Sequence, residues 1–167
     1  MSSHESDALT YSDAFLRNIL RKAKTIAIVG ASDKPTRPSF GVLAFLLAHG
    51  YRVIGVNPGL AGNSVHGAPF VASLADIHEP IDMVDIFRNS EAAGAVVDEA
   101  LALKPLPKAI WMQLDVRNDA AAARAQAKGV KVVMDRCPKI EYGRLLAGSE
   151  AARKTEARPK QRGGPRT

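Results

Sequence analysis

The chain has 167 residues, which is the length of one domain with a short remainder. Hydrophobic residues make up 46% and charged residues 24%, proportions that exclude a largely disordered or fibrous protein. The longest apolar runs are far shorter than the roughly 20 residues that cross a bilayer, and the polar N-terminus lacks the apolar stretch of a secretory signal. The single cysteine, Cys137, cannot form an intramolecular disulfide. We therefore expect a cytoplasmic protein without a membrane segment.

The formal net charge of +6 is concentrated at the C-terminus. Residues 149–167 contain six basic and two acidic residues, whereas the preceding 148 residues carry a net charge of only +2. This segment also contains proline and glycine and no apolar periodicity, which predicts a basic disordered tail. Two interpretations of the tail stay open, a solubilising extension and a weak contact with nucleic acid or anionic lipid. The nearly neutral body does not favour nucleic acid as a partner.

The body alternates short β-branched runs with helical patterns, which is typical of a parallel sheet covered by helices. An N-terminal segment, residues 1–24, carries one helix, and the domain itself spans residues 25–148. The expected elements follow in chain order: a helix at 12–22, a strand at 25–29, a helix at 39–48, strands at 52–56 and 82–87, a helix at 91–103, a strand at 109–112, a helix at 119–128, a strand at 130–134 and a short helix at 138–146.

The pattern within these elements indicates the fold class. Nearly unbroken apolar stretches such as residues 26–29 suit strands that are buried on both faces. Gly50 and Gly129 are placed where a left-handed residue ends a helix. We expect an α/β protein with a Rossmann-like doubly wound five-stranded parallel sheet and helices on both faces.

The segment after the first strand carries the strongest functional signal. It reads Gly30-Ala31-Ser32-Asp33-Lys34-Pro35-Thr36-Arg37-Pro38-Ser39 and runs from a buried strand into a helix. In open α/β sheets the ligand crevice lies beyond the carboxyl ends of the strands. Glycine lets the backbone approach a ligand closely, a helix start attracts anions, and Lys34 and Arg37 add positive charge. The pattern predicts a phosphate or pyrophosphate site, with a plain surface loop as the alternative.

The usual signature of a nicotinamide cofactor is incomplete in this loop. Ser32 and Pro35 stand where the pattern Gly-x-Gly-x-x-Gly requires its second and third glycines. After the second strand, Asn57 stands where an acidic residue normally binds the adenosine ribose. The lysine motif of nucleoside triphosphatases is absent from the sequence as well. NAD is therefore a weaker candidate than another phosphate-bearing ligand.

Seven segments between about residues 25 and 145 share the pattern of one family. They are Ile28-Val29-Gly30-Ala31-Ser32, Arg37-Pro38-Ser39-Phe40-Gly41-Val42, Gly50-Tyr51-Arg52-Val53-Ile54-Gly55-Val56-Asn57-Pro58, Ser73-Leu74-Ala75-Asp76-Ile77, Val84-Asp85-Ile86-Phe87-Arg88, Trp111-Met112-Gln113 and Met134-Asp135-Arg136-Cys137-Pro138-Lys139-Ile140-Glu141. In this order they resemble the small single-domain CoA-binding proteins of bacteria and archaea. The same fold is the CoA-binding domain of the succinyl-CoA synthetase α subunit.

The resemblance implies that the protein binds coenzyme A or an acyl-CoA. It implies three groups of cofactor-binding residues: Gly30, Ala31, Ser32, Asp33, Lys34, Arg37 and Ser39 for the phosphates, Asn57, Pro58 and Gly59 for the adenosine end, and Phe87, Arg88 and Asn89 along the nucleotide or pantetheine. Leu60 stands where the synthetase has a lysine, which removes one phosphate contact. The chain also lacks the second domain that carries the synthetase's phosphorylated histidine, so ligase activity is not expected.

No catalytic arrangement is visible in the sequence. The four histidines have no metal-ligand spacing, and Ser32 lies outside the elbow motif of hydrolases. Asp82 and Asp85 flank the expected third strand and do not face each other. We expect a non-catalytic binding protein with no metal site. Two other classes stay open, an NAD(P)-binding oxidoreductase or redox sensor on the same fold, and an interaction module that uses the basic tail.

Three residues near the ends of the last strands carry weaker signals. Cys137 follows the fifth strand beside Arg136, which leaves open a disulfide exchange with the CoA thiol, although a structural cysteine is the commoner case. Trp111 suits the core, with a part in the crevice wall as the alternative, and Gln113 suits an amide contact to pantetheine. Beyond the small-molecule ligand, a homodimer stays open as an assembly.

Overall fold

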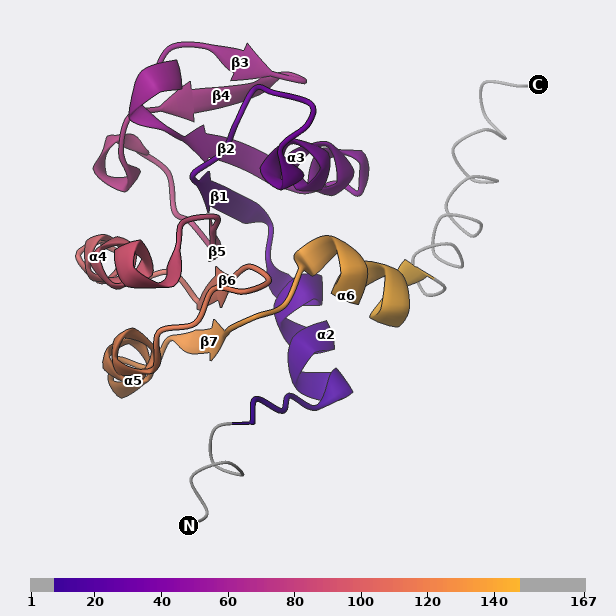
Figure 1. Cartoon of the computed structure of the whole chain (residues 1–167), viewed down its shortest axis with the longest axis vertical. Helices are drawn as coiled ribbons and strands as arrows, with labels where there is room; N and C mark the ends of the chain where they lie inside the picture. The colour runs from indigo at the N-terminus through magenta and orange to yellow at the C-terminus, as the bar shows by residue number, and fades with distance from the viewer. Residues whose placement is uncertain (1–7, 148–167) are drawn as a thin grey trace.

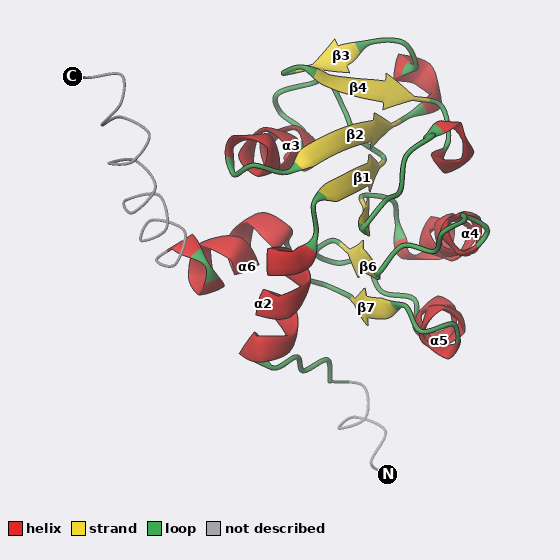
Figure 2. Ribbon diagram, turned by 180° about the vertical axis from the view of Figure 1, so that it is seen from behind, coloured by secondary structure: helices red, strands yellow, loops and turns green. Residues whose placement is uncertain are grey.

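The computed structural model describes residues 8–147, in which five α-helices lie on the two sides of one sheet (Figures 1 and 2). The basic tail expected at 149–167 lies outside the described residues. In chain order the described elements are α2 (Asp13–Lys22), β1 (Thr25–Val29), α3 (Pro38–Ala48), β2 (Arg52–Val56), the 3-10 turn η1 (Pro58–Leu60), β3 (Ser64–Val65), β4 (Ala68–Val71), the 3-10 turn η2 (Leu74–Asp76), β5 (Met83–Ile86), α4 (Ser90–Leu101), β6 (Ala109–Met112), α5 (Asp119–Ala127), β7 (Lys131–Val133) and α6 (Pro138–Leu145).

The sheet has seven described strands and is mixed, so the expectation of a five-stranded, wholly parallel sheet is wrong. The strand order is β3-β4-β2-β1-β5-β6-β7, with β3 antiparallel to β4 and every other neighbouring pair parallel. The extra strands form a hairpin around His66 and Gly67, whose φ angles of 52° and 87° suit a two-residue hairpin turn. Pro69 sits in this hairpin, and proline inside a short run weakens the strand signal in the sequence.

The other elements match the expected ones to within two residues at each end. The expected strand 82–87 is one residue shorter at each end. The carboxylate of Asp82, just before β5, accepts hydrogen bonds from the backbone amides of Lys24 and Thr25 at 2.8 and 3.0 Å. Gly50 and Gly129 have φ angles of 93° and 84°, which confirms the left-handed helix ends.

Two apolar clusters hold the helices on the sheet. Side chains of α2, α3 and α6 pack with Ile26 and Ile28 of β1 on one face, whereas those of α4 and α5 pack with Ala27 and Val29 on the other. Alternation of side chains along a strand explains why β1 serves both clusters. Figure 1 shows α3 and α6 on one side of the sheet and α4 and α5 on the other.

The strand order reverses between β1 and β5, because β2 and β4 lie on one side of β1 and β5, β6 and β7 lie on the other. Ligands of open α/β sheets bind at the carboxyl ends of the strands where such a reversal occurs. The loop from β1 to α3 lies at this point. Among the described helices, none is long and apolar enough to cross a membrane.

Candidate functional site

The loop between β1 and α3 begins with a backbone conformation that requires glycine. Gly30 has a φ angle of 88°, and a Cβ atom placed there would lie 2.7 Å from the carbonyl oxygen of Phe87. The amide of Gly30 donates a hydrogen bond of 3.0 Å to the carbonyl of Val56. The loop is therefore seated directly against the chain segments that follow β2 and β5.

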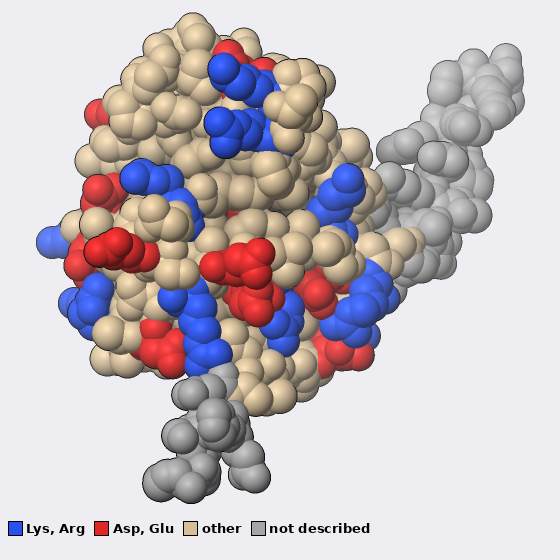
Figure 3. All heavy atoms as spheres, in the orientation of Figure 1, with Lys and Arg blue, Asp and Glu red and all other residues tan. Residues whose placement is uncertain are grey.

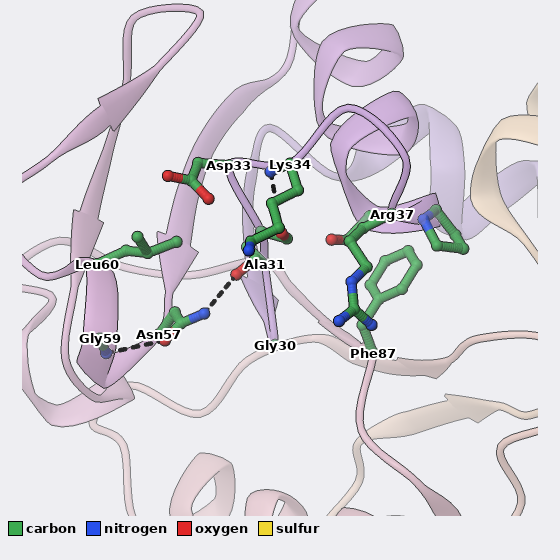
Figure 4. Close-up of a pocket in the computed structure, with 12 residues that line it drawn as sticks. Gly30, Ala31, Asp33, Lys34, Arg37, Asn57, Gly59, Leu60 and Phe87 are labelled. Atoms are coloured by element: carbon green, nitrogen blue, oxygen red, sulfur yellow. Dashed lines mark hydrogen bonds between the residues drawn. The ribbon is translucent and has the colours of Figure 1, made fainter.

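Asn57 joins the loops that follow β1 and β2. Its Nδ2 donates to the carbonyl of Ala31 at 2.8 Å, and its Oδ1 accepts from the amide of Gly59 at 2.9 Å (Figure 4). Both polar atoms of the side chain are thus used within the protein. This asparagine fixes the two loops relative to each other, at the position where an acidic residue would bind a ribose in a nicotinamide site.

The loop lines a hollow of about 450 Å³, which we call the loop cavity. Its lining residues are Gly30, Ala31, Ser32, Asp33, Lys34, Arg37, Pro38, Ser39, Asn57, Gly59, Leu60 and Phe87. Figure 4 shows the side chains of Lys34 and Arg37 reaching toward the space above Gly30 from the same loop. Lys and Arg atoms also gather on the surface over this loop in the space-filling view (Figure 3).

The two cations of the loop cavity have no acidic partner among residues 8–147. None of the ion pairs between described side chains uses Lys34 or Arg37. Helix α3 begins at Arg37 and Pro38 without a side-chain cap. Pro38 has no N–H and the amide of Phe40 donates to the carbonyl of Arg37 at 3.0 Å, so the helix offers the cavity mainly the positive end of its dipole and the amide of Ser39. Positive charge without a protein partner at a helix start favours a bound anion.

A second hollow of about 600 Å³ lies on the other side of Gly30 and Asn57, and we call it the helix cavity because α4 forms one wall. Its lining residues are Val29, Gly30, Val56, Asn57, Pro58, Ala72, Ser73, Arg88, Ala92, Ala95, Val96 and Glu99. Most of these side chains are small or apolar, and Ser73, Arg88 and Glu99 supply the polar groups. Gly30 and Asn57 line both hollows, so the two cavities are neighbours.

The structure gathers nearly all of the expected binding residues at these cavities. Ten of them line the loop cavity, and Pro58 and Arg88 line the helix cavity. Asn89 lines neither cavity, because its Oδ1 accepts a hydrogen bond of 2.7 Å from the amide of Ala92 and caps α4. Sequence reasoning missed the wall formed by α4. The signal was the spacing of Ala92, Ala95 and Glu99, which places them on one helix face.

Two aspartates near β5 have opposite environments. Burial raises the pKa of Asp82, but hydrogen bonds from the amides of Thr25 and Lys24 and from the Lys108 ammonium outweigh it, so the pKa lies below the ordinary value. Asp85 is fully buried inside β5, and this burial raises its pKa well above the ordinary value. The two carboxyl groups lie at different positions along the strand and form no pair.

Cys137 and Trp111 are both buried at the last strands. Cys137 is 6% exposed and precedes α6. The neighbouring Arg136 guanidinium binds the carbonyls of Asp135 and Leu9 and lies over the ring of Tyr11, so it is engaged away from the thiol. Trp111 has no exposed surface, which confirms its core position, and its Nε1 donates to the carbonyl of Arg136 at 2.9 Å.

An open, mainly parallel sheet with a glycine-turned loop at its reversal point is typical of nucleotide-binding α/β domains. Residues 24–143 match the CoA binding domain family, and the chain therefore belongs to this family. An uncharacterized protein of Bacillus subtilis strain 168, YneT, is 37% identical over 131 residues, which are 78% of this chain and 94% of that protein.

Two solved structures share this architecture. The protein cell-free ID.343 from Thermus thermophilus is 40% identical, with a TM-score of 0.76 over 81% of this chain and all of that one. A hypothetical protein from Pyrococcus horikoshii OT3 is 36% identical, with a TM-score of 0.76 over 82% of this chain and 94% of that one.

Proposed function

We propose that this protein binds coenzyme A or an acyl-CoA non-covalently and catalyses no reaction of its own. The observation that carries the proposal is the loop cavity. In a chain of the CoA binding domain family, Lys34 and Arg37 stand beside an uncapped helix start and have no acidic partner among residues 8–147. Such a site suits the phosphates of a nucleotide.

The phosphates would lie in the loop cavity. The start of α3 contributes a partial positive charge of about half a unit, and Lys34 and Arg37 contribute full charges. The Oγ of Ser32 accepts a hydrogen bond from the amide of Lys34, which leaves its own proton to donate to a phosphate oxygen. Arg88 lies against Gly30 in the helix cavity and supplies a further cation.

The adenosine would lie in the helix cavity. The small and apolar side chains of Ala92, Ala95 and Val96 offer a flat wall for a planar base, and Ser73 and Glu99 offer hydrogen-bonding groups at its margin. The shared residues Gly30 and Asn57 let one ligand occupy both cavities. The volumes of about 450 and 600 Å³ suit the two halves of a nucleotide cofactor.

The proposal includes no reaction. Asp82 binds the backbone amides at the start of β1, and Asp85 lies inside the sheet, so these carboxyl groups cannot act on one substrate atom as an acid and base pair. Within the described range, no group of three or more His, Cys, Asp or Glu side chains is placed to hold a metal ion.

Isothermal titration with CoA, acetyl-CoA, NAD and NADP tests the proposal. We expect CoA to bind, and the double variant Lys34→Ala/Arg37→Ala to weaken binding at least tenfold, or about 1.4 kcal/mol. The matched control is Lys104→Ala/Lys128→Ala, which removes the same charge from exposed positions just after α4 and α5. Binding of NAD alone would favour the oxidoreductase alternative, and equal losses in the two double variants would refute the phosphate-loop account.

A further inference from the structure

Lysine side chains lie at the amino ends of several strands, at the edge of the sheet opposite the loop cavity. Lys24 precedes β1, Lys108 precedes β6 and Lys131 begins β7. These strands are parallel, and the strand order places β1, β5, β6 and β7 side by side. Because neighbouring strands are about 4.8 Å apart, the three lysines form a row that spans roughly 14 Å. We call it the lysine row.

Two small hollows border the lysine row and share one lining residue. The first has a volume of about 60 Å³ and is lined by Lys108, Lys131 and Lys22, which lies in the last turn of α2. The second has a volume of about 130 Å³ and is lined by Lys24 and Arg21. These side chains are all exposed to solvent. Two further cations therefore lie beside the row.

One acidic residue lines these hollows among the residues that the structure describes, and it is already paired. This residue is Asp82, which precedes β5. Its carboxylate accepts hydrogen bonds from the amides of Lys24 and Thr25 and from the Lys108 ammonium at 3.3 Å. Asp82 therefore offsets one charge of the lysine row and leaves the others.

The other lysines have no acidic partner within residues 8–147. The ion pairs between described side chains use none of Lys22, Lys24 and Lys131. The Lys131 ammonium donates instead to the neutral Oδ1 of Asn18 at 3.0 Å. The negative end of the α2 dipole explains a cation in its last turn, such as Lys22, but not Lys131, which begins a strand. The positive charge of this edge is therefore available to an external anion.

The described chain also ends at this edge. Leu146, which follows α6, lines the same hollow as Lys24. Residues 149–167, outside the described range, contain six basic and two acidic residues, so the chain that continues from this edge is basic. Acidic residues stand in the first turns of α4, α5 and α6, at the opposite edge. The body is nearly neutral in sum because these charges cancel, and the sum conceals a basic edge.

The shape of this edge selects the class of anion. A row of cations suits a linear polyanion better than a single small anion, and duplex nucleic acid carries one negative charge per about 1.7 Å of its axis. Protein partners are held by anchor side chains in pockets, and a hollow of about 60 Å³ is too small for a large one. Leu106, in the loop before β6, is 37% exposed, which leaves little apolar area to insert into a membrane.

The rings beside the lysine row favour a duplex over a single strand. Single strands are bound by aromatic side chains that stack on the bases. Tyr51 and Tyr142 line the hollow beside Lys24, but they are only 8% and 3% exposed. Their rings cannot stack on bases, so contacts at this edge are made to phosphates.

We propose that this edge binds the phosphate backbone of duplex nucleic acid without sequence preference. Lys22, Lys108 and Lys131 make the contacts around the first hollow, and Arg21 and Lys24 extend them along the edge. Each lysine that meets a phosphate releases a counterion from the duplex, so binding weakens as salt is added. The site is separate from the loop cavity and does not depend on the proposed binding of CoA.

The experiment measures the fluorescence anisotropy of a labelled duplex DNA of mixed sequence with the full chain, at salt concentrations between about 50 and 200 mM. The variant Lys22→Ala/Lys131→Ala removes two charges of the edge and breaks no ion pair between described side chains. The matched control, Lys34→Ala/Arg37→Ala, removes two charges from the opposite edge. Vesicles that contain phosphatidylserine and a polyglutamate peptide serve as competitors, and urea unfolding confirms that both variants are folded.

We expect the wild type to bind the duplex with a logarithmic affinity that falls linearly with the logarithm of the salt concentration. Lys22→Ala/Lys131→Ala should reduce this slope by about 1.8, because each lost phosphate contact removes about 0.9. Between about 50 and 200 mM salt, the affinity of this variant should then fall about 12-fold less than that of the wild type. The control should keep the slope of the wild type, and Lys22→Ala/Lys131→Ala should keep its affinity for CoA within about twofold.

Several results would overturn the proposal. They are no binding of the duplex by the wild type at about 50 mM salt, an unchanged slope for Lys22→Ala/Lys131→Ala, and equal changes of slope in the two double variants. An unchanged slope would assign the binding to residues 149–167 alone. Displacement of the duplex by the vesicles or the peptide at lower charge concentration than by unlabelled DNA would assign the edge to that partner instead. A wild type that binds DNA but no CoA would refute the proposed function and leave this inference standing.

Discussion

Gly30 provides a quantitative test of how the loop is seated. Replacing it by alanine introduces two separate problems, a left-handed φ of 88° for a residue with a Cβ, and a Cβ only 2.7 Å from the carbonyl oxygen of Phe87. Gly50 shares the first problem and lacks the second, because its φ is 93° and no atom lies within 4 Å of an added Cβ. Gly50→Ala is therefore the matched control.

The two problems have different magnitudes. A left-handed alanine costs about 1–2 kcal/mol, which applies to both variants. The contact at Gly30 adds about 1–3 kcal/mol, because the neighbour is backbone and cannot rotate away as a side chain would. The amide of Phe87 is also tied to the carbonyl of Val29 at 2.8 Å, which holds this segment in place. We expect a total loss of about 2–5 kcal/mol for Gly30→Ala.

Urea unfolding followed by far-ultraviolet circular dichroism measures both losses. With a denaturant slope of about 2 kcal/mol/M, an extra loss of about 2 kcal/mol lowers the midpoint of Gly30→Ala by about 1 M below that of Gly50→Ala. Equal midpoints for the two variants would show that a Cβ at residue 30 meets no unfavourable contact, which would refute the close approach of Gly30 to the carbonyl of Phe87.

Three further predictions concern stability. The pKa of Asp85 is raised in the folded state. Wild-type stability should therefore fall relative to Asp85→Asn by about 1.4 kcal/mol per pH unit from about pH 4 up to the folded-state pKa and then level off, measured by urea unfolding at several pH values. Asp82→Ala should cost about 2 kcal/mol at pH 7. Since the pKa of Asp82 is lowered in the folded state, this cost should start to shrink only as the pH falls below about 4 and should be smallest below the folded-state pKa, measured by unfolding curves across that range. Gly41→Ala, inside α3 with open space around the new Cβ, should add about 0.5–1 kcal/mol of stability, measured as a higher melting temperature.

The parallel core of the fold could be predicted because its signals are strong and local. Strands buried on both faces give nearly continuous apolar runs, and the helices between them have apolar stripes and glycine ends. The hairpin of β3 and β4 gives neither signal. Ser64–Val65 is too short to show alternation, and Pro69 in β4 contradicts a strand by the usual rule. Tertiary pairing with β2 forms this hairpin, and a local pattern does not contain that information.

The candidate site was predicted in part for a related reason. Lys34 and Arg37 belong to one continuous loop, so their proximity could be read directly from the chain. The helix cavity brings Ser73, Arg88 and Glu99 together from three separate segments, which no single stretch of sequence records. Asn89 illustrates the converse case. Asparagine is common as the N-cap of a helix. Asn89 has this role, since its Oδ1 accepts from the amide of Ala92, whereas the resemblance had implied a contact with the ligand.

The starts of the helices explain why the anion is expected on the α3 side. Helices α4 and α5 begin with Asn89 and Asn118, whose side chains accept hydrogen bonds from the amides of Ala92 and Ala121. Helices α3 and α6 follow β1 and β7 on the opposite face and begin without a side-chain cap. Each capping oxygen satisfies one open amide and reduces the attraction for an external anion. Helices α3 and α6 begin with Pro38 and Pro138, which have no N–H, so the positive ends of their dipoles have no capping side chain on the face of the sheet where the loop cavity lies, although α2 on that face is capped by Ser12.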